Sequence, residues 1–306
     1  MSDRDLLAQC IKDESIIRSF YLDLDTDAAL TKIDALSIKI TEKQQDIPFN
    51  AAVKGYVGAV DADGDPWILK PTVDRSETLY HRICTLAFLI DHWMGTLSAP
   101  TTVCTIAGKD YRAVKVVKNA IQISSYNYLE RPFIDWLRAD LVNRWLYFDE
   151  DRNPNNYLVI RNSKEEPFVV AIDFDKADFE ATSMKITGIE GKFGWVRGEK
   201  TRFLTLLRPD NFDGLSIEIF DSRLKSMMSI PAEALRKLAR RLVDGYAEDP
   251  DGLADSLVAN ISHRRTYIDT YFRKMFKLEC DTKNISNSDE YSMFGASFLS
   301  AYGNNK

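Results

Sequence analysis

Apolar and polar positions along the chain follow two different periods, and the change from one period to the other divides the sequence into segments. Over residues 1–45 the apolar positions recur at helical spacing, as in Ala28, Leu30, Ile33, Leu36 and Ile38. Such spacing predicts amphipathic helices. We therefore expect a helical N-terminal extension over residues 1–48.

Residues 49–118 carry strand-like runs around one helical segment. Two runs flank Asp61–Asp65, where an Asp-Gly pair favours a hairpin turn. Helical spacing then extends from Ser76, the expected N-cap, to about Trp93. Two further strand-like runs follow, Thr101–Ala107 and Tyr111–Val117. The order β-β-α-β-β predicts a small sheet that carries one helix.

From residue 119 to residue 280 helical spacing dominates, with one interruption. An apolar stripe from Phe133 to Phe148 predicts an amphipathic helix, and the polar loop Asp149–Asn156 ends it. Two short strands come next, Tyr157–Arg161 and Phe168–Ile172. Helical spacing returns over 203–207, 215–228, 232–246 and 253–277.

These patterns predict an α+β protein with two lobes and two flanking segments. The helical extension over 1–48 precedes a small β-rich N-lobe over 49–118 and a mainly helical C-lobe over 119–280. Residues 281–306 are rich in Ser and Asn, which is typical of a poorly ordered tail.

Composition and charge narrow the classes of function. The chain has 306 residues, of which 45% are hydrophobic, and no apolar run approaches the roughly 20 residues of a membrane span. No apolar signal core follows the first five residues, so we expect a cytoplasmic protein or one delivered by a specialised secretion route. A net charge of −6 argues against bulk nucleic-acid binding. The four cysteines form no Cys-x-x-Cys pair and the three histidines show no zinc spacing.

Oxygen-bearing side chains gather in two short motifs of the C-lobe. The first motif runs from Asp151 to Asn156, and the second is the Asp173-Phe174-Asp175 sequence after an apolar strand. Carboxylates at the end of an apolar strand are costly unless they face donors, solvent or a cation. Hard oxygen ligands suit Mg²⁺ or Mn²⁺. Asp151 would then be free to deprotonate an attacking hydroxyl group.

A phosphoryl-transfer site also needs a cation on the nucleotide phosphates. Lys70, at the end of a strand in the small sheet, is the candidate, and Glu77 in the first turn of the next helix would hold it. Asp74 and Asp91 are alternatives for that role. The serial order of strand lysine, helix glutamate, loop Asp and Asn, and strand-end Asp is that of protein-kinase-like folds.

The two motifs resemble those of a known superfamily. The sequence Asp151-Arg152-Asn153-Pro154-Asn155-Asn156 is similar to the catalytic loops of phosphatidylinositol 3-/4-kinase-like enzymes and of HipA-like kinases. The sequence Ala171-Ile172-Asp173-Phe174-Asp175 resembles their metal-binding strand, and weaker similarity extends over residues 50–277. The resemblance implies a bilobal protein-kinase-like fold and an ATP- and Mg²⁺-dependent kinase.

The resemblance also implies a role for each residue of the site. Lys70 would contact the ATP phosphates with Glu77 as its brace, Asp151 would be the catalytic base, and Asn156 and Asp173 would be metal ligands. The backbone of Val116, Val117, Lys118 and Asn119 would bind adenine, and Gly55 and Gly58 are the nearest candidates for a phosphate-covering loop.

The sequence departs from the family pattern at two positions. Asn153 replaces the loop histidine, and Asp175 replaces the glycine after Asp-Phe, where it would supply another metal ligand. Neither departure removes a central role. A catalytically inactive pseudokinase that binds nucleotide stays open as the non-enzyme alternative.

The acceptor is less well defined by the sequence. We expect a protein Ser/Thr first, and a phosphoinositide or another small alcohol second. Basic clusters near residues 236–241 and 263–277 predict solvated helix faces, with an anionic ligand as the alternative. Hydroxyl residues stand where kinases keep an activation segment: Thr182, Ser183, Thr187 and Thr201.

Overall fold

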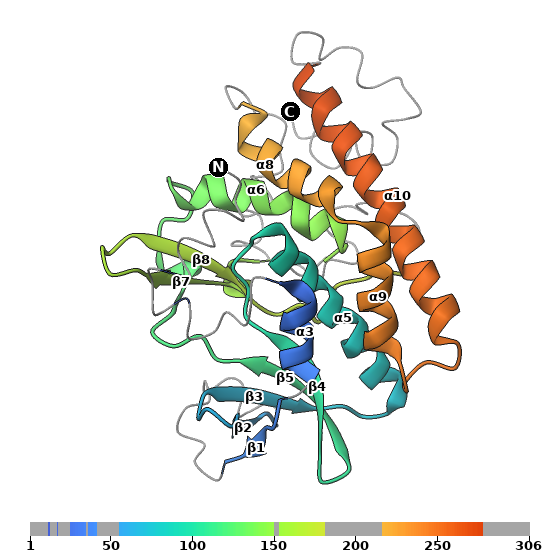
Figure 1. Cartoon of the computed structure of the whole chain (residues 1–306). Coiled ribbons are helices and arrows are strands. Elements are labelled where there is room, and N and C mark those ends of the chain that lie inside the picture. Colours follow the sequence, from blue (N-terminus) through green and yellow to red (C-terminus); the bar gives the residue numbers. More distant parts are fainter. Residues whose placement is uncertain are drawn as a thin grey trace, which may run out of the picture.

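The computed structural model describes residues 25–34, 36–41, 55–149, 153–180 and 216–277, together with Lys12 and Ile17. The described chain is a mixed α+β protein with two antiparallel sheets and a group of packed helices (Figure 1). Within the described residues, no helix has both the length and the apolar character that crossing a bilayer would need.

The larger sheet has five strands in the order β1-β2-β3-β5-β4. Its strands are β1 (Lys39–Ile40), β2 (Val57–Val60), β3 (Pro66–Pro71), β4 (Thr101–Ile106) and β5 (Lys109–Lys115). Side chains alternate across a strand, so each strand contributes to both faces. One face buries a small core of Ile38, Ala59, Trp67, Leu69, Tyr111 and Ala113.

The opposite face of this sheet carries two cationic side chains next to each other. Lys70 on β3 is the direct partner of Arg112 on β5, and Ile68 is the partner of Val114 one pair further along. Because residues two apart share a face, these four side chains lie on the face opposite the Trp67 core. The register of β3 and β5 therefore fixes the position of both cations.

Helix α5 (Arg75–Met94) follows β3, and its N-cap is Asp74 rather than the predicted Ser76. Asp74 has an extended backbone, and its side chain accepts a hydrogen bond from the Glu77 N–H at 2.8 Å. Aspartate and serine are both good N-caps, so the sequence pattern could not choose between them. The helix ends at Gly95, whose φ of 77° is the left-handed conformation of a C-cap.

The second sheet has three strands: β6 (Ile121–Gln122), β7 (Tyr157–Arg161) and β8 (Pro167–Ala171). Its last strand is joined to the segment that leads into β4. The Ala99 N–H donates to the Ala171 carbonyl and the Ala171 N–H donates to the Leu97 carbonyl, both at 2.9 Å. A small apolar cluster that includes Leu97, Val117 and Val170, with Val114 packed against it, lies between the two sheets. The end of β8 is thereby held against the larger sheet.

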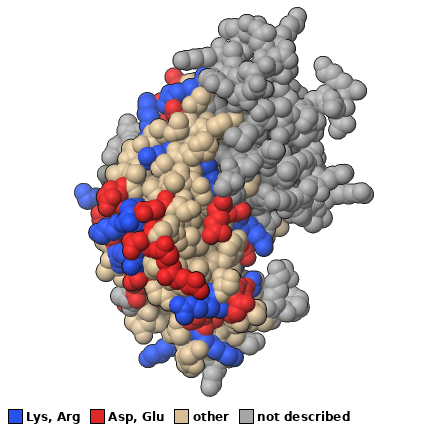
Figure 2. Space-filling model, turned by 90° about the vertical axis from the view of Figure 1, so that its right-hand side faces the viewer, with Lys and Arg blue, Asp and Glu red and all other residues tan. Residues whose placement is uncertain are grey.

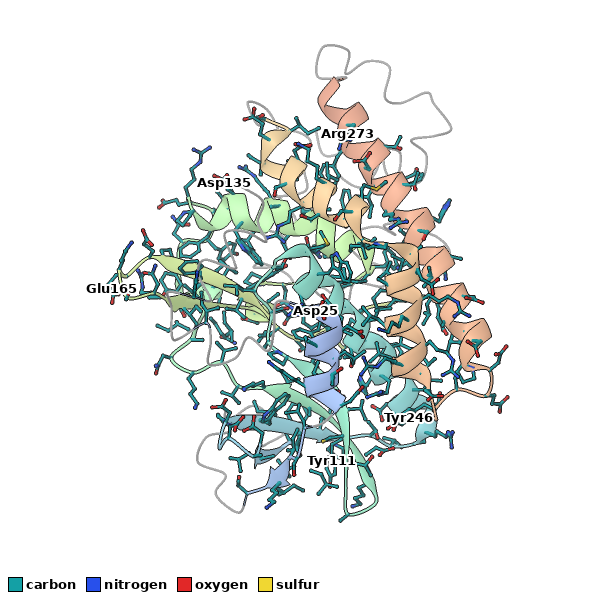
Figure 3. All side chains as sticks on the ribbon, in the orientation of Figure 1. Asp25, Tyr111, Asp135, Glu165, Tyr246 and Arg273 are labelled. Atoms are coloured by element: carbon teal, nitrogen blue, oxygen red, sulfur yellow. The ribbon has the colours of Figure 1, made fainter. Side chains whose placement is uncertain are left out.

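The largest core lies among the helices. It joins α5 to four helices: α6 (Phe133–Leu146), α8 (Glu218–Ser229), α9 (Ala232–Val243) and α10 (Pro250–Lys277). In Figure 1 α9 and α10 lie side by side, and α9 also packs against α5. Figure 3 labels Tyr246, just after α9, whose carbonyl accepts a hydrogen bond from Arg75 at 3.2 Å.

A buried polar network fixes α5, α6 and α8 relative to one another. Asn143 on α6 donates to Asp91 on α5 at 2.9 Å and to Thr96 at 2.8 Å. Arg223 on α8 donates to Asn143 at 3.1 Å and also to Thr96. A buried network of this kind penalises any shift of one helix alone, because the shift would leave polar groups without partners.

The N-terminal extension is only partly helical. Helix α3 (Thr26–Asp34) agrees with the predicted helical pattern and packs against α5, with Leu30 and Ile33 in the large core. The helix predicted to continue to residue 48 is wrong at Lys39–Ile40, which form the edge strand β1 paired with β2. Leu36, Ile38 and Ile40 alternate with polar residues, and this period of two was the better guide.

The other predicted elements agree with the structure where it describes them. The β-β-α-β-β order is confirmed by β2, β3, α5, β4 and β5, and the hairpin by β7 and β8. The sequence pattern did not predict β6 or the two 3₁₀ helices η2 (Ile123–Ser125) and η3 (Pro154–Asn156). The predicted helix at 203–207, the surface segment before it and the tail at 281–306 lie outside the described residues.

Substitution Asp74→Ala should lower the free energy of unfolding by about 1 kcal/mol, because it removes the N-cap of α5. Urea unfolding followed by circular dichroism measures the change. Ser76→Ala is the matched control, since exposed Ser76 lies inside the first turn and should cost much less. Equal losses in the two variants would contradict the cap assignment.

Candidate active site

Arg112 on β5 reaches across to the end of the second sheet and pairs with two carboxylates. One guanidinium nitrogen lies 2.8 Å from an oxygen of Asp175, and the other donates to Asp173. The Arg112 side chain is 10% exposed, whereas the Asp173 side chain is 39% exposed. Burial lowers the pKa of Arg112, but the two carboxylates outweigh this effect and raise it overall. The guanidinium therefore stays charged.

Local structure explains why both carboxylates of the Asp173-Phe174-Asp175 motif face Arg112. β8 ends at Ala171, and Asp173 has a left-handed backbone with a φ of 63°. Phe174 is buried and its ring packs edge-on against Tyr147, with 5.9 Å between the ring centroids. The buried phenylalanine anchors the turn, and the residues on either side of it pair with Arg112.

Asn156 is brought to the same place by the hairpin register. The Ile172 N–H donates to the Asn156 carbonyl at 3.0 Å, and the following residue, Tyr157, pairs with Ala171. Asn156 is buried and ends η3, whose N-cap is Asn153. The Asn153 side chain accepts the Asn155 N–H at 2.9 Å, so Asn153 helps to shape this loop.

Asp151 lies outside the described residues, as do Glu150 and Arg152. Asp149 and Asn153 bracket this segment, and Asn153 accepts the Asn156 N–H at its carbonyl at 2.9 Å. The role of Asp151 therefore stays a prediction from the sequence.

Glu77, which the sequence predicted to hold Lys70 in place, has other partners in the structure. Glu77 accepts the Val73 N–H at 2.6 Å, and its other oxygen lies 3.6 Å from His81. In the described part of the chain no ion pair joins Lys70 to Glu77. The alternatives for the brace are engaged as well, since Asp74 caps α5 and Asp91 accepts a hydrogen bond from Asn143.

His81 on α5 lies close enough to Arg112 and Lys70 for their charges to affect its pKa. Burial, the positive charge of Arg112 and that of Lys70, in this order, lower the pKa of His81 to about 4, against the opposite effect of Glu77. Its Nδ1 atom is buried without a hydrogen-bond partner. Lys70, Arg112 and His81 therefore share one electrostatic environment above the carboxylates.

The segment from Gly55 to Gly58 lies along this cluster. Burial raises the pKa of Tyr56. The positive charge of Arg112 acts to lower this pKa, and the carboxylates of Asp173 and Asp175 act to raise it. Gly55 has a φ of 74°, which favours glycine, and Gly58 pairs with Ile68. Gly58 is buried, and the register places it on the same sheet face as Lys70.

The predicted adenine-binding backbone follows β5. The Val116 N–H already donates to the Pro66 carbonyl at 2.9 Å. Val117 is buried between the sheets, and the Lys118 ammonium group lies 2.8 Å from Asp65. The Val116 N–H is therefore already engaged within the larger sheet, and the adenine contacts of Val117, Lys118 and Asn119 stay predictions.

Helix α5 also contacts the segment that follows the second carboxylate. The Tyr80 hydroxyl donates to the Asp175 carbonyl at 3.0 Å, and the Cys84 thiol donates to the Ala177 carbonyl at 3.6 Å. Cys84 is buried, Cys104 is half-buried, and both are free thiols. The positions of α5 and of the Asp173–Ala177 segment are therefore coupled.

The donor set fits a hard divalent cation. Asp173 and Asp175 would supply carboxylate oxygens, and Asn156, the third ligand predicted from the sequence, would supply an amide oxygen; these are the ligand types that Mg²⁺ prefers. Burial and the Asp173 carboxylate raise the pKa of Asp175, against the effect of Arg112, so a cation between the carboxylates would be favoured. The described residues contain no group of three or more His, Cys, Asp or Glu side chains that would complete a protein-only metal site. Phosphate and water oxygens would have to fill the remaining positions.

The basic clusters of α9 are paired with acidic side chains. Arg236 binds Asp251 and Asp255, Lys237 binds Asp27, and Arg241 binds Asp27 and Asp34. Figure 2 shows Lys and Arg interspersed with Asp and Glu on this side of the molecule. In α10, Arg264 is buried and donates to the Leu146 carbonyl at 3.3 Å. The α9 contacts agree with the prediction of a solvated face with acidic neighbours, whereas buried Arg264 departs from that prediction in α10.

Arg112 is the residue of the site that the sequence analysis missed. It stands between Tyr111 and Ala113 in a strand whose alternate positions are buried. A charged residue in the interior of such a strand was the available signal, because burying it requires a counter-charge. The partner could not be inferred, since Asp173 is 61 residues away in the sequence.

No family model matches the sequence, and no curated protein matches it. Among solved structures, a proinflammatory kinase from Helicobacter pylori, CtkA, is similar to this chain with a TM-score of 0.45 and 12% sequence identity. The similarity covers 73% of this chain and 95% of that chain. A likeness at this level assigns no activity, so the residues of the site must carry the functional conclusion.

Acid should destabilise the chain partly through His81. The folded state keeps His81 neutral down to about pH 4, whereas the unfolded chain takes up the proton near 6.5. The stability that His81 contributes is therefore complete above pH 6.5 and is lost as the pH falls towards 4, by up to about 3 kcal/mol. Urea unfolding of the parent chain and of His81→Gln at several pH values measures it.

The difference in unfolding free energy between the two proteins should shrink or reverse in acid. His263→Gln, which removes an exposed histidine of α10, should keep the acid-side loss of the parent chain. Parallel pH profiles for the parent chain and His81→Gln would refute the assignment.

Proposed function

We propose that this chain is an ATP- and Mg²⁺-dependent phosphotransferase whose first acceptor class is a protein Ser/Thr hydroxyl. The observation that carries the proposal is the convergence of separate segments on one place. The Ile172–Asn156 hydrogen bond joins the two C-terminal motifs, and the Arg112 ion pairs hold Asp173 and Asp175 against the sheet face that bears Lys70.

In this proposal the sheet holds the nucleotide and the hairpin end holds the metal. Lys70 binds phosphate oxygens, and Gly58 on the same sheet face places no side chain between the phosphates and the sheet. Asn156 and Asp173, with Asp175 as a further ligand, hold Mg²⁺, which when bound neutralises the charge of the phosphates. The backbone of Val117 and Lys118 takes the adenine.

Asp151 is proposed as the group that orients and deprotonates the acceptor hydroxyl. Its position in the sequence, five residues before Asn156, places it on the loop that leads into the metal-binding motif. Acceptor hydroxyl groups follow the second motif closely in the sequence, beginning at Thr182 and Ser183. Transfer to the chain's own serine and threonine residues is therefore the simplest reaction to detect.

A second function, nucleotide binding without transfer, is favoured by one observation. Arg112 already neutralises both carboxylates that would bind the metal. If this pairing persists when nucleotide binds, the chain keeps a nucleotide site and lacks a metal centre.

Incubation with γ-labelled ATP and Mg²⁺ or Mn²⁺, followed by intact mass measurement, tests the first function. Asp151→Asn and Asp173→Asn should each lower the rate of transfer by at least about a hundredfold, because one removes the base and the other a metal ligand. Asp63→Asn, at an exposed position of the β2–β3 turn, is the matched control and should retain full transfer.

The same proteins separate the two functions. Thermal stabilisation by ATP in every protein, with no label transferred by the parent chain to itself, to protein substrates or to phosphoinositides, would establish the binding module instead. Label on phosphoinositides alone would show that the chain transfers phosphate to a lipid and not to a protein Ser/Thr hydroxyl.

A further inference from the structure

The Arg112 guanidinium occupies the position in which a cation would bridge the two carboxylates of the site. Separate nitrogens of the one side chain pair with Asp173 and with Asp175. Arg112 comes from β5 of the larger sheet, whereas both carboxylates follow β8. The pairing is thus a contact between the two sheets as well as a local charge balance.

We propose that Arg112 is an internal counter-ion that competes with the divalent metal for Asp173 and Asp175 and transfers to the nucleotide phosphates when the metal binds. This inference rests on the proposed function. It makes Arg112 a positioning residue of the site and assigns it a regulatory effect, because metal and nucleotide would then each promote the binding of the other.

Charge and geometry argue for exchange over simultaneous binding. A carboxylate oxygen that accepts a guanidinium hydrogen bond has fewer lone pairs to offer a metal, and a divalent cation placed beside a guanidinium is repelled by it. Metal binding alone would therefore have to displace Arg112 and leave a mostly buried charge without a partner, which is costly.

Nucleotide phosphates remove that cost. Lys70 lies directly opposite Arg112 on the neighbouring strand, so phosphates bound by Lys70 would lie within the reach of the Arg112 side chain. Guanidinium groups bind phosphate oxygens as well as carboxylates, with two parallel hydrogen bonds. Arg112 would exchange one anionic partner for another, while the metal takes the carboxylates.

The proposal has a direct thermodynamic consequence. In the parent chain, metal alone should bind weakly, and nucleotide should strengthen its binding, with the reciprocal effect of metal on nucleotide. Removing the guanidinium removes the competitor. In Arg112→Met, Mn²⁺ without nucleotide should bind about tenfold or more tightly than in the parent chain, because the guanidinium no longer competes for the two adjacent carboxylates.

Titration of the full chain with Mn²⁺ in the absence of nucleotide, followed by electron paramagnetic resonance of the free ion, measures this affinity directly. Arg236→Met is the matched control, since Arg236 also pairs with two aspartates, Asp251 and Asp255, far along the chain from the site motifs. The control should bind Mn²⁺ as the parent chain does. Equal or weaker Mn²⁺ binding by Arg112→Met would overturn the counter-ion proposal.

A second variant covers the case in which Arg112→Met does not fold. Arg112→Lys keeps the positive charge but replaces the two-armed guanidinium by a single ammonium group, which cannot hold both carboxylates in the same way. Its Mn²⁺ affinity should lie above that of the parent chain. An affinity no higher than that of the parent chain, in a folded protein, would overturn the proposal as well.

The outcome is distinguishable from a failure of the proposed function. Tighter Mn²⁺ binding in Arg112→Met, together with no nucleotide binding by the parent chain, would support the counter-ion proposal and contradict the proposed phosphotransferase function. Phosphate transfer by the parent chain without any gain in Mn²⁺ affinity in the variants would support the phosphotransferase function and contradict the counter-ion proposal.

Discussion

A buried guanidinium dictates much of this structure, because a charge in that position must keep anionic partners. Arg112 meets this requirement with two carboxylates that belong to a different sheet, so the electrostatic need of one strand determines where the end of β8 must lie. The backbone hydrogen bonds between Ala171 and the Leu97–Ala99 segment also hold the end of β8 against the larger sheet. The site is therefore built at the contact between two sheets, and it is as rigid as that contact.

Helix α5 connects this contact to the rest of the molecule. Its N-terminal half carries Glu77 and His81 near the cations and binds the Asp175–Ala177 backbone through Tyr80 and Cys84. Its C-terminal end joins the Asn143 network through Asp91. A displacement of the helix would change all three sets of contacts together. The surroundings of the carboxylates thus depend on packing that extends into the largest core.

The sequence predicted the elements better than it predicted their contacts. The strands and α-helices from β2 to β8, apart from β6, follow local periodicity. The convergence of the Asn156 and Asp173 segments follows from a hairpin, which is a local structure. Arg112 was missed because its partners are distant in sequence, and Glu77 was assigned to Lys70 although nearer groups, Val73 and His81, take its oxygens. Strand β1 was read as helix because Leu36 and Ile38 also fit the helical spacing that begins at Ala28, although Leu36, Ile38 and Ile40 alternate with polar residues.

Helix α3 has a practical consequence for anyone who shortens this chain. Its Asp27 neutralises Lys237 and Arg241, and its Leu30 and Ile33 are part of the same core as α5 and α9. A fragment that starts after residue 48 would expose the apolar side chains that Leu30 and Ile33 cover and would leave Lys237 and Arg241 without Asp27. Such a fragment would be prone to aggregate and to attract polyanions for reasons unrelated to the native protein.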